Sequence, residues 1–390
     1  MDQTRFPDAS ESADPDRFPD AEPLMEIWPD WKLTAPLDSG ASGSVYLAVH
    51  RNHPEMQAAV KIISIPQEEE QTLLLRQEGL SDEQIRRRYA AEAEERMAAV
   101  RRMEQLKGLS HIVSMEDCKT LPRPDGPGYL ICIRMELLKT LRQYLSDKTL
   151  REEEVIQLGM ELSEALSVCH GNGILHMDLK PENIFVNDRL ASGVLYKLGD
   201  FGVSRPLMDS REDRPIQGSM LYLPPEVSRR ESPDVRSDLY MLGLVLYQLM
   251  NRNRLPFLEE KQIHTHADLQ DTIRMRLNGI ALPPPETASP EMAAVLLKAC
   301  AFDPAGRYAD AEELKAALAG LLRKEKKSSG ERKKLRKRCG PALAAVLFLL
   351  LALVLSFPLW SRLGNPGPVP APSPTPVPMI VVIDRTGGQP

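Results

Sequence analysis

Two short stretches in the middle of the chain decide its fold. Residues 174–186 read ILHMDLKPENIFV, and residues 197–203 read KLGDFGV. Their polar residues of interest are Asp178, Lys180, Asn183 and Asp200. Each of these alone would most often be an ordinary surface residue. Their order and spacing together are too specific for coincidence, and they predict a single catalytic site.

These residue types suit phosphoryl transfer. A carboxylate such as Asp178 can orient an attacking hydroxyl, and the side-chain oxygens of Asn183 and Asp200 are the ligands that Mg²⁺ prefers. Lys180 follows Asp178 by two residues and can neutralise charge on the moving group. The pattern therefore predicts metal-assisted phosphoryl transfer.

A glycine-containing turn and a lysine precede these stretches. Residues 37–46 read LDSGASGSVY between two strand-like runs, and the backbone N–H groups of such a turn can approach phosphate oxygens closely. Taken alone, the turn is more simply explained as a Gly/Ser hairpin. Lys61 ends the strand-like run AAVK, where a buried ammonium group would need an anionic partner.

These motifs resemble the signature set of the eukaryotic-type (Hanks-type) serine/threonine protein kinases. The resemblance continues through GSMLYLPPE at 218–226, SDLYMLGL at 237–244 and DPAGRY at 303–308, so it covers residues ~31–320. It implies an α+β fold, the bilobal protein kinase fold, with a small β-rich N-lobe and a larger α-helical C-lobe. Other stretches, such as WPDWKL, are similar to stretches in bacterial single-pass membrane kinases.

The resemblance also implies a role for each matching residue. Catalysis would fall to Asp178, Lys180 and Lys61, and the metal would be held by Asn183 and Asp200. Lys180 within DLKPEN is typical of family members that phosphorylate Ser and Thr in protein substrates. ATP with Mg²⁺, or Mn²⁺ as an alternative ion, is the implied cofactor. The implied nucleotide-binding residues are Leu37, Gly40, Gly43, Val45, Ala59, Lys61, Met135, Glu136, Leu138 and Phe185.

The same resemblance predicts how these residues are arranged. Val45 and Ala59 would cover the adenine from above and Phe185 from below. Met135 would be the gatekeeper, followed by the Glu136 carbonyl and the Leu138 backbone at the adenine edge. In the C-lobe, Asp238 would hold the catalytic loop, and Glu226 would pair with Arg307.

Four positions depart from the family pattern: Asp38, Ala99, Met177 and Pro225. Asp38 replaces the first glycine of the phosphate loop, and Pro225 replaces an alanine in an extended turn. Met177 replaces the arginine that pairs with a phosphorylated activation loop, so we expect activity without loop phosphorylation. Ala99 replaces the helix glutamate that pairs with Lys61. Glu95 lies one turn earlier on the same helix face and is either its substitute or a solvated charge.

Two function hypotheses follow. The first is an active kinase that transfers the ATP γ-phosphate to protein hydroxyls in signal transduction. The second is a pseudokinase, a scaffold or nucleotide-binding docking module that keeps the fold but has little or no activity. Because Lys61, Asp178, Asn183 and Asp200 are all present, the first is favoured.

The C-terminal quarter predicts a membrane anchor. Residues 341–360 contain no charged residue and would be about 30 Å long as a helix, the thickness of a bilayer core. A buried helix of a large domain is the alternative, but such helices usually have a polar face. Ten Lys and Arg residues lie in 323–338, immediately before the run, so the kinase side is expected to be cytoplasmic and the protein a single-pass protein of the cell membrane.

The charge pattern agrees with this layout. The chain carries a net charge of −6, but residues 323–338 carry +8 and residues 1–322 carry −15. This argues against nucleic acid as a partner, because that would require basic charge on a folded face. A juxtamembrane basic segment is expected to attract anionic lipid head groups, or to be a solvated linker.

The predicted organisation has five parts. The kinase domain among them contains a long charged insert at 66–92, which is helical in pattern and could mediate homodimer contacts or regulation. The parts are an acidic disordered leader at 1–30, a protein kinase domain at 31–322, a basic juxtamembrane linker at 323–340, a transmembrane helix at 341–360 and a Pro-rich extracytoplasmic tail at 361–390.

Overall fold

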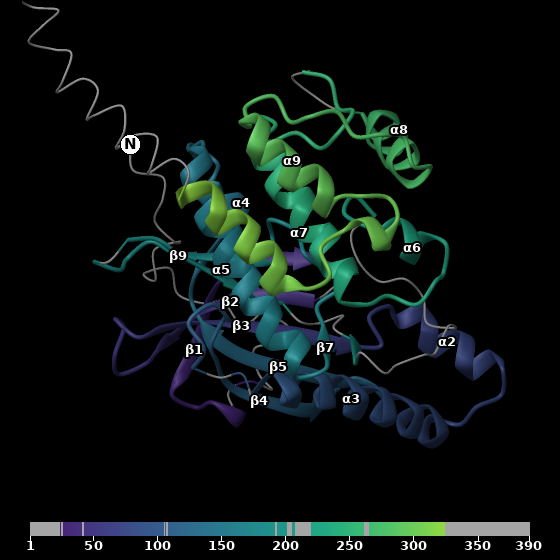
Figure 1. Ribbon diagram of the computed structural model, residues 1–390. Helices are drawn as coiled ribbons and strands as arrows, with labels where there is room; N and C mark the ends of the chain where they lie inside the picture. The colour runs from purple at the N-terminus through teal and green to yellow at the C-terminus, as the bar shows by residue number, and fades with distance from the viewer. Residues whose placement is uncertain are drawn as a thin grey trace, which may run out of the picture. The chain divides into compact units, whose positions relative to one another are not determined.

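Figure 1 shows a computed structural model of the chain. It describes residues 24, 26–40, 43–104, 106, 108–191, 193–200, 205–206, 220–260 and 265–323. The predicted juxtamembrane linker from residue 324 onward, the transmembrane helix at 341–360 and the tail at 361–390 lie outside these residues. Within them, no helix is both long enough and apolar enough to cross a bilayer.

The N-terminal part of the fold is a five-stranded antiparallel sheet with the strand order β1-β2-β3-β5-β4. The strand-like runs on either side of the glycine-containing turn form β1 and β2, and the run AAVK lies in β3, so the predicted β-rich lobe is confirmed. Alternation of apolar and polar residues is weak in β4, an edge strand that the sequence analysis did not single out. The strands are β1 (Trp31–Gly40), β2 (Gly43–His50), β3 (Gln57–Ile65), β4 (Met115–Pro122) and β5 (Tyr129–Glu136).

One face of this sheet is covered by a long helix, α3 (Asp82–Glu104). Apolar residues spaced by four along the helix lie on a single face and pack with Ile63, Ile65 and Ile131 of the sheet. The shorter helix α2 (Glu69–Gln77) joins this cluster through Leu75. The insert expected at 66–92 is thus helical, and its second half belongs to α3. The residues of α3 in the cluster are Ile85, Tyr89, Ala93 and Met97.

The opposite face of the sheet is covered by the segment that precedes β1. Leu24 and Trp28 are buried against Tyr46, Val60 and other residues of the sheet. The indole Nε1 of Trp28 donates a hydrogen bond to Asp117 Oδ2 at 2.8 Å. Leu24 and residues 26–30, which the sequence analysis had assigned to the disordered leader, therefore belong to the described structure.

The C-terminal part is mainly helical, as predicted. Helix α7 is almost entirely buried and packs against both α5 and α9 (Figure 1). The helices are α4 (Leu141–Tyr144), α5 (Glu152–Gly171), α6 (Pro225–Ser228), α7 (Val235–Leu249), α8 (His266–Leu277), α9 (Pro290–Ala299) and the 3₁₀ turn η2 (Pro304–Gly306).

Short strands lie between the sheet and these helices. They form one ladder in the order β6-β8-β9 and one in the order β10-β7, and they border the segments that carry the catalytic motifs. The strands are β6 (Lys139–Thr140), β7 (Ile174–Leu175), β8 (Ile184–Asn187), β9 (Leu195–Leu198) and β10 (Arg205–Pro206).

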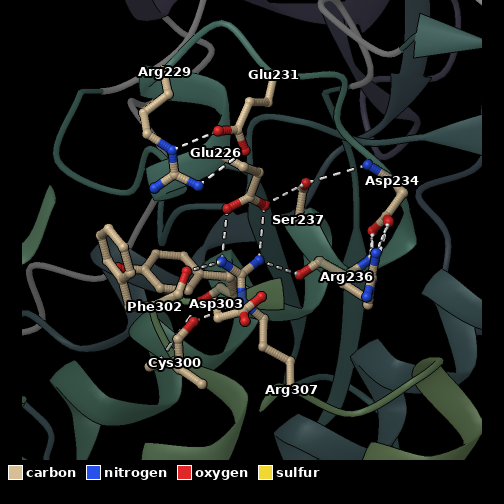
Figure 2. Close-up of polar contacts among 12 residues, drawn as sticks. Glu226, Arg229, Glu231, Asp234, Arg236, Ser237, Cys300, Phe302, Asp303 and Arg307 are labelled. Atoms are coloured by element: carbon tan, nitrogen blue, oxygen red, sulfur yellow. Dashed lines mark hydrogen bonds and ion pairs between the residues drawn. The ribbon is translucent and has the colours of Figure 1, made fainter. Parts of the chain in front are cut away.

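A buried ion pair ties the start of α6 to the segment after α9. Figure 2 shows the Arg307 guanidinium donating to both carboxylate oxygens of Glu226, at 2.7 and 2.8 Å. Ser237 of α7 donates to the same carboxylate at 2.7 Å. Both charged side chains are almost completely buried, so each depends on the other for its charge partner.

We predict that Arg307→Met destabilises the C-lobe by about 3–5 kcal/mol, because it leaves the Glu226 carboxylate buried without a cation. The matched control is Arg229→Met, since Arg229 pairs with Glu231 at the surface and its loss should change stability little (Figure 2). Urea unfolding followed by fluorescence measures both. Equal free energies of unfolding for the two variants would contradict the prediction.

Candidate active site

The catalytic loop is held by one buried carboxylate, that of Asp238 on α7. Its two oxygens accept hydrogen bonds from the backbone N–H groups of His176 and Met177, both at 2.8 Å. His170 Nε2 lies 2.9 Å from the same carboxylate. Met177 has a φ of 64°, in the left-handed region that residues other than Gly, Asn and Asp rarely adopt. The fixed carboxylate compensates for this unfavourable backbone, as the resemblance implied for Asp238.

The Asp178 carboxylate is fixed by its neighbours in the same loop. Lys180 Nζ donates to Asp178 Oδ2 at 2.8 Å, and Asn183 Nδ2 donates to the same oxygen at 2.8 Å. The Asn183 amide also donates to the Asp178 carbonyl at 2.7 Å. Three of the residues predicted from the sequence therefore form one cluster, in which Asp178 and Asn183 are buried and Lys180 is half-buried.

Lys61 of β3 forms an ion pair with Asp200, which follows β9. Burial of Asp200 opposes its ionisation, but the Lys61 ammonium holds the pKa of that carboxyl below its usual value. His176 and Lys180 act in the same direction from the catalytic loop. The pair joins the sheet to the C-lobe and brings the predicted lysine and the predicted metal ligand into contact.

The segment around Asp178 and the segment before Asp200 are also joined by hydrogen bonds to backbone groups. His176 Nδ1 accepts from the Asp178 N–H at 3.2 Å, so its Nε2 carries the proton that is donated to the Gly199 carbonyl at 3.0 Å. The Gly199 N–H in turn donates to the Asn183 carbonyl at 3.0 Å. These hydrogen bonds hold His176 and Asn183 next to Gly199, although the two segments are far apart in the sequence.

The ion-pair partner of Lys61 is not a residue of α3, the helix in which Ala99 takes the place of the expected glutamate. Among the described side chains of α3, none forms an ion pair with the Lys61 ammonium, whose partner is Asp200. Glu95 lies on the exposed side of α3, and the neighbouring Glu92 pairs with Arg96. In this structure the carboxylate that neutralises Lys61 comes from the C-lobe.

Four of the predicted nucleotide-binding residues lie in one apolar cluster. Leu37, Val45, Ala59 and Met135 pack there around the buried side chain of Leu137. This arrangement follows from strand register, because β3 pairs with β2 on one side and with β5 on the other, and Met135 lies opposite Ala59. Leu138, the other predicted adenine-edge residue, follows β5 and is half-buried.

Gly40 and Gly43 lie opposite each other where β1 meets β2. Gly43 has a φ of 115°, and a Cβ there would lie 2.3 Å from the carbonyl oxygen of Ile62. Nothing lies within 4 Å of a Cβ built on Gly40. Close backbone packing within the sheet thus requires Gly43, a reason separate from the phosphate approach expected from the sequence.

The Glu136 side chain has a partner that sequence reasoning missed. Its Oε1 accepts from Lys197 Nζ at 2.6 Å and from the Ser114 backbone N–H at 2.6 Å. Lys197 lies on β9 and is buried. The two residues are 61 positions apart, and the only available signal was an ionisable residue in an otherwise apolar strand. This pair fixes the segment whose carbonyl is expected at the adenine edge.

The asparagine and aspartate expected to hold Mg²⁺ fit that ion. Because the Asn183 amide nitrogen donates twice to Asp178, its Oδ1 makes no hydrogen bond to the described residues. The second oxygen of Asp200 likewise makes no such contact beside the ion pair with Lys61. Two oxygen donors remain available, as a hard cation requires.

Comparison with known proteins agrees with this geometry. Residues 31–318 match the protein kinase domain family, so the chain belongs to that family. It is 34% identical over 260 residues to the serine/threonine-protein kinase pkn3 of Myxococcus xanthus, covering 63% of this chain and 44% of pkn3. It is 31% identical over 230 residues to the serine/threonine-protein kinase PknB of Mycolicibacterium smegmatis, covering 56% of this chain and 35% of PknB. The chain thus spans less than half the length of these relatives.

Gly199 makes room for Phe185, the residue expected beneath the adenine. A Cβ added at Gly199 would lie 2.7 Å from the Phe185 ring and 2.7 Å from Val113. Gly199→Ala therefore has to push the ring from its position, and we predict about tenfold weaker nucleotide binding, within the range for overpacking.

The matched test is the double variant Gly199→Ala with Phe185→Leu. The smaller leucine removes the overlap with the ring but not that with Val113, so the loss caused by Gly199→Ala should be smaller in the Phe185→Leu background than in the wild type. Titration of a fluorescent ATP analogue measures all four proteins. Strictly additive losses would show that the two positions do not compete for volume.

Proposed function

We propose that this chain is an ATP-dependent protein kinase that transfers the γ-phosphate to Ser and Thr hydroxyls of protein substrates. The observation that carries the proposal is the cluster in which Asp178 is oriented by Lys180 and Asn183 while Lys61 is paired with Asp200. The carboxylate that orients the hydroxyl, the two lysines and the two metal ligands that phosphoryl transfer uses are all present. The gaps in the family pattern lie at supporting positions.

Each residue of this cluster has its own role in the proposed reaction. Asp178 accepts the hydrogen of the substrate hydroxyl and holds its oxygen toward the phosphorus. Lys180 and Lys61 supply positive charge on either side of the transferred group. Asn183 and Asp200 would hold Mg²⁺, which neutralises phosphate charge when bound.

The choice of Ser and Thr as acceptors rests on two supports. Lys180 lies where the family's serine/threonine members carry a lysine, and in this structure it contacts the catalytic carboxylate directly. The relatives are also named as serine/threonine-protein kinases. A pseudokinase remains the outcome to which a failed activity test would point.

The proposal includes a membrane anchor at residues 341–360 with the kinase domain on the cytoplasmic side. It is supported by the uncharged length of that run and by the ten Lys and Arg residues that precede it. The basic residues at 323–338 would lie against anionic lipid head groups, each contributing about 1 kcal/mol near the surface. Signalling across or along that membrane is the role this layout suits.

We predict that the full chain in detergent transfers phosphate from ATP to casein, and that Asp178→Asn lowers the turnover at least about a hundredfold, because the hydroxyl loses its base. Incorporated ³²P and phosphoamino acid analysis measure this. Equal background incorporation by both proteins would favour the pseudokinase.

Because Met177 cannot pair with a phosphate, prior phosphatase treatment should leave turnover unchanged.

We predict that the full chain stays in the membrane fraction after an alkaline carbonate wash. Leu350→Arg with Leu353→Arg should release it, since a charge at the centre of a membrane helix costs about 2.5–3.5 kcal/mol on insertion scales. The matched control replaces the same two leucines with alanine and should stay bound. Immunoblotting of the washed fractions reads out the result, and retention of the arginine variant would exclude this anchor.

A further inference from the structure

Asp38, one of the four departures from the family pattern, is an exposed carboxylate near the end of β1. Its Oδ1 accepts a hydrogen bond from the Ser39 backbone N–H at 2.9 Å. Among the described residues, no Lys, Arg or His forms an ion pair with it. An unpaired negative charge in this turn requires a reason, because the turn is expected to approach phosphates, which are anions.

Strand register decides on which face of the sheet Asp38 lies. Pro36 of β1 lies opposite Tyr46 of β2. Asp38, two residues further along β1, lies opposite Val45, the immediate neighbour of Tyr46. Leu37 is therefore an extra residue in β1, the arrangement of a β-bulge. Without it, the alternation of side chains would put Asp38 on the face of Tyr46; with it, Asp38 shares the face of Val45.

The same face carries residues predicted to bind the nucleotide. Val45 packs with Ala59 and Met135 in the apolar cluster, and it lies opposite Lys61 of β3. Asp38, Val45 and Lys61 thus form one row across the adjacent strands β1, β2 and β3 (Figure 1). Since neighbouring strands lie ~4.8 Å apart, the backbones at Asp38 and Lys61 are separated by about 10 Å.

Opposite charges lie at the two ends of this row. Lys61 is 4% exposed and is paired with Asp200, and in the proposed reaction it supplies positive charge to the phosphates. Asp38 lies two strands away on the same face and has the sign that repels phosphates. Because Asp38 is exposed, water and salt weaken this repulsion, but a separation of about 10 Å is no longer than the Debye length at moderate salt.

The contact with Ser39 acts in the same direction. The backbone N–H groups of this turn are the donors expected to approach phosphate oxygens. The Asp38 carboxylate already occupies the one at Ser39. A phosphate oxygen that binds this N–H therefore has to displace a carboxylate oxygen.

We propose that Asp38 is a specificity-determining residue that selects the complex of ATP with a divalent cation over free ATP. Free ATP carries roughly four negative charges on its phosphates, and a bound divalent cation cancels about two of them. The repulsion by Asp38 is therefore larger for free ATP. The inference rests on the proposed kinase function, and it gives Asp38 a role separate from those of Asn183 and Asp200, which would hold the cation itself.

The test compares Asp38→Asn with Asp30→Asn in the full chain in detergent. Asp30 is an exposed aspartate just before β1, so its replacement changes the net charge equally and is the matched control. A fluorescent ATP analogue is titrated into each protein, once with excess Mg²⁺ and once with excess EDTA. We expect Asp38→Asn to lower the Kd for the free nucleotide about fivefold and the Kd for the Mg²⁺ complex by less than about twofold. The control should leave both values unchanged.

Salt and a second variant separate the charge from the hydrogen bond. At about 1 M KCl the Debye length falls to ~3 Å, so wild type and Asp38→Asn should differ by less than about twofold. Asparagine keeps an oxygen that accepts from the Ser39 N–H, whereas Asp38→Ala also removes that acceptor. Tighter binding by Asp38→Ala without any gain in Asp38→Asn would overturn the inference, because only the occupied N–H would then matter.

The ratio of the two Kd values is the decisive quantity. An equal ratio in Asp38→Asn and in wild type would overturn this inference alone, since wild type would still bind the nucleotide. Weaker binding of both forms by Asp38→Asn would also overturn it, because the carboxylate would then contribute to binding. Wild-type protein that binds neither form would contradict the proposed function itself, and this inference with it.

Discussion

The buried carboxylate of Asp238 is the constraint on which the catalytic geometry depends. It is completely buried on α7 and would be costly to desolvate without its three donors, which come from His170, His176 and Met177. By accepting two successive N–H groups, it stabilises the left-handed backbone at Met177 and thereby aims Asp178. The position of the catalytic aspartate is thus set by a helix more than fifty residues further along the chain.

The pairing of Lys61 with Asp200 changes what holds the two lobes together. With Ala99 at the position expected for a glutamate, α3 contributes no described carboxylate to Lys61, and its place on the sheet is set by the apolar ridge that includes Tyr89 and Met97. Charge contact between the lobes falls instead to Lys61–Asp200 and to Lys197–Glu136. Both pairs join a β-strand of one lobe to a residue of the other, and both are largely shielded from solvent.

Much of the fold could be predicted because its signals are local. The strands β1, β2 and β3 follow from strand-like runs, and the loop around Asp178 follows from the spacing of its motif. What could not be predicted depends on distant partners. The burial of Trp28 depends on Asp117 and on the sheet, and the charge of Lys197 makes sense only beside Glu136. Single-sequence patterns carry no information about which distant residue supplies a partner.

Two parts of the structure are stabilised by different kinds of contact, apolar packing in one and buried polar contacts in the other. In the cluster predicted to bind the nucleotide, Leu37, Val45, Ala59 and Met135 pack by shape, and such contacts tolerate changes that conserve volume. In the C-lobe, Arg276 donates to backbone carbonyls and Arg307 pairs with the Glu226 carboxylate, and such contacts weaken when a single donor or acceptor is lost. A substitution that conserves volume is therefore expected to be tolerated better in the apolar cluster than at either arginine.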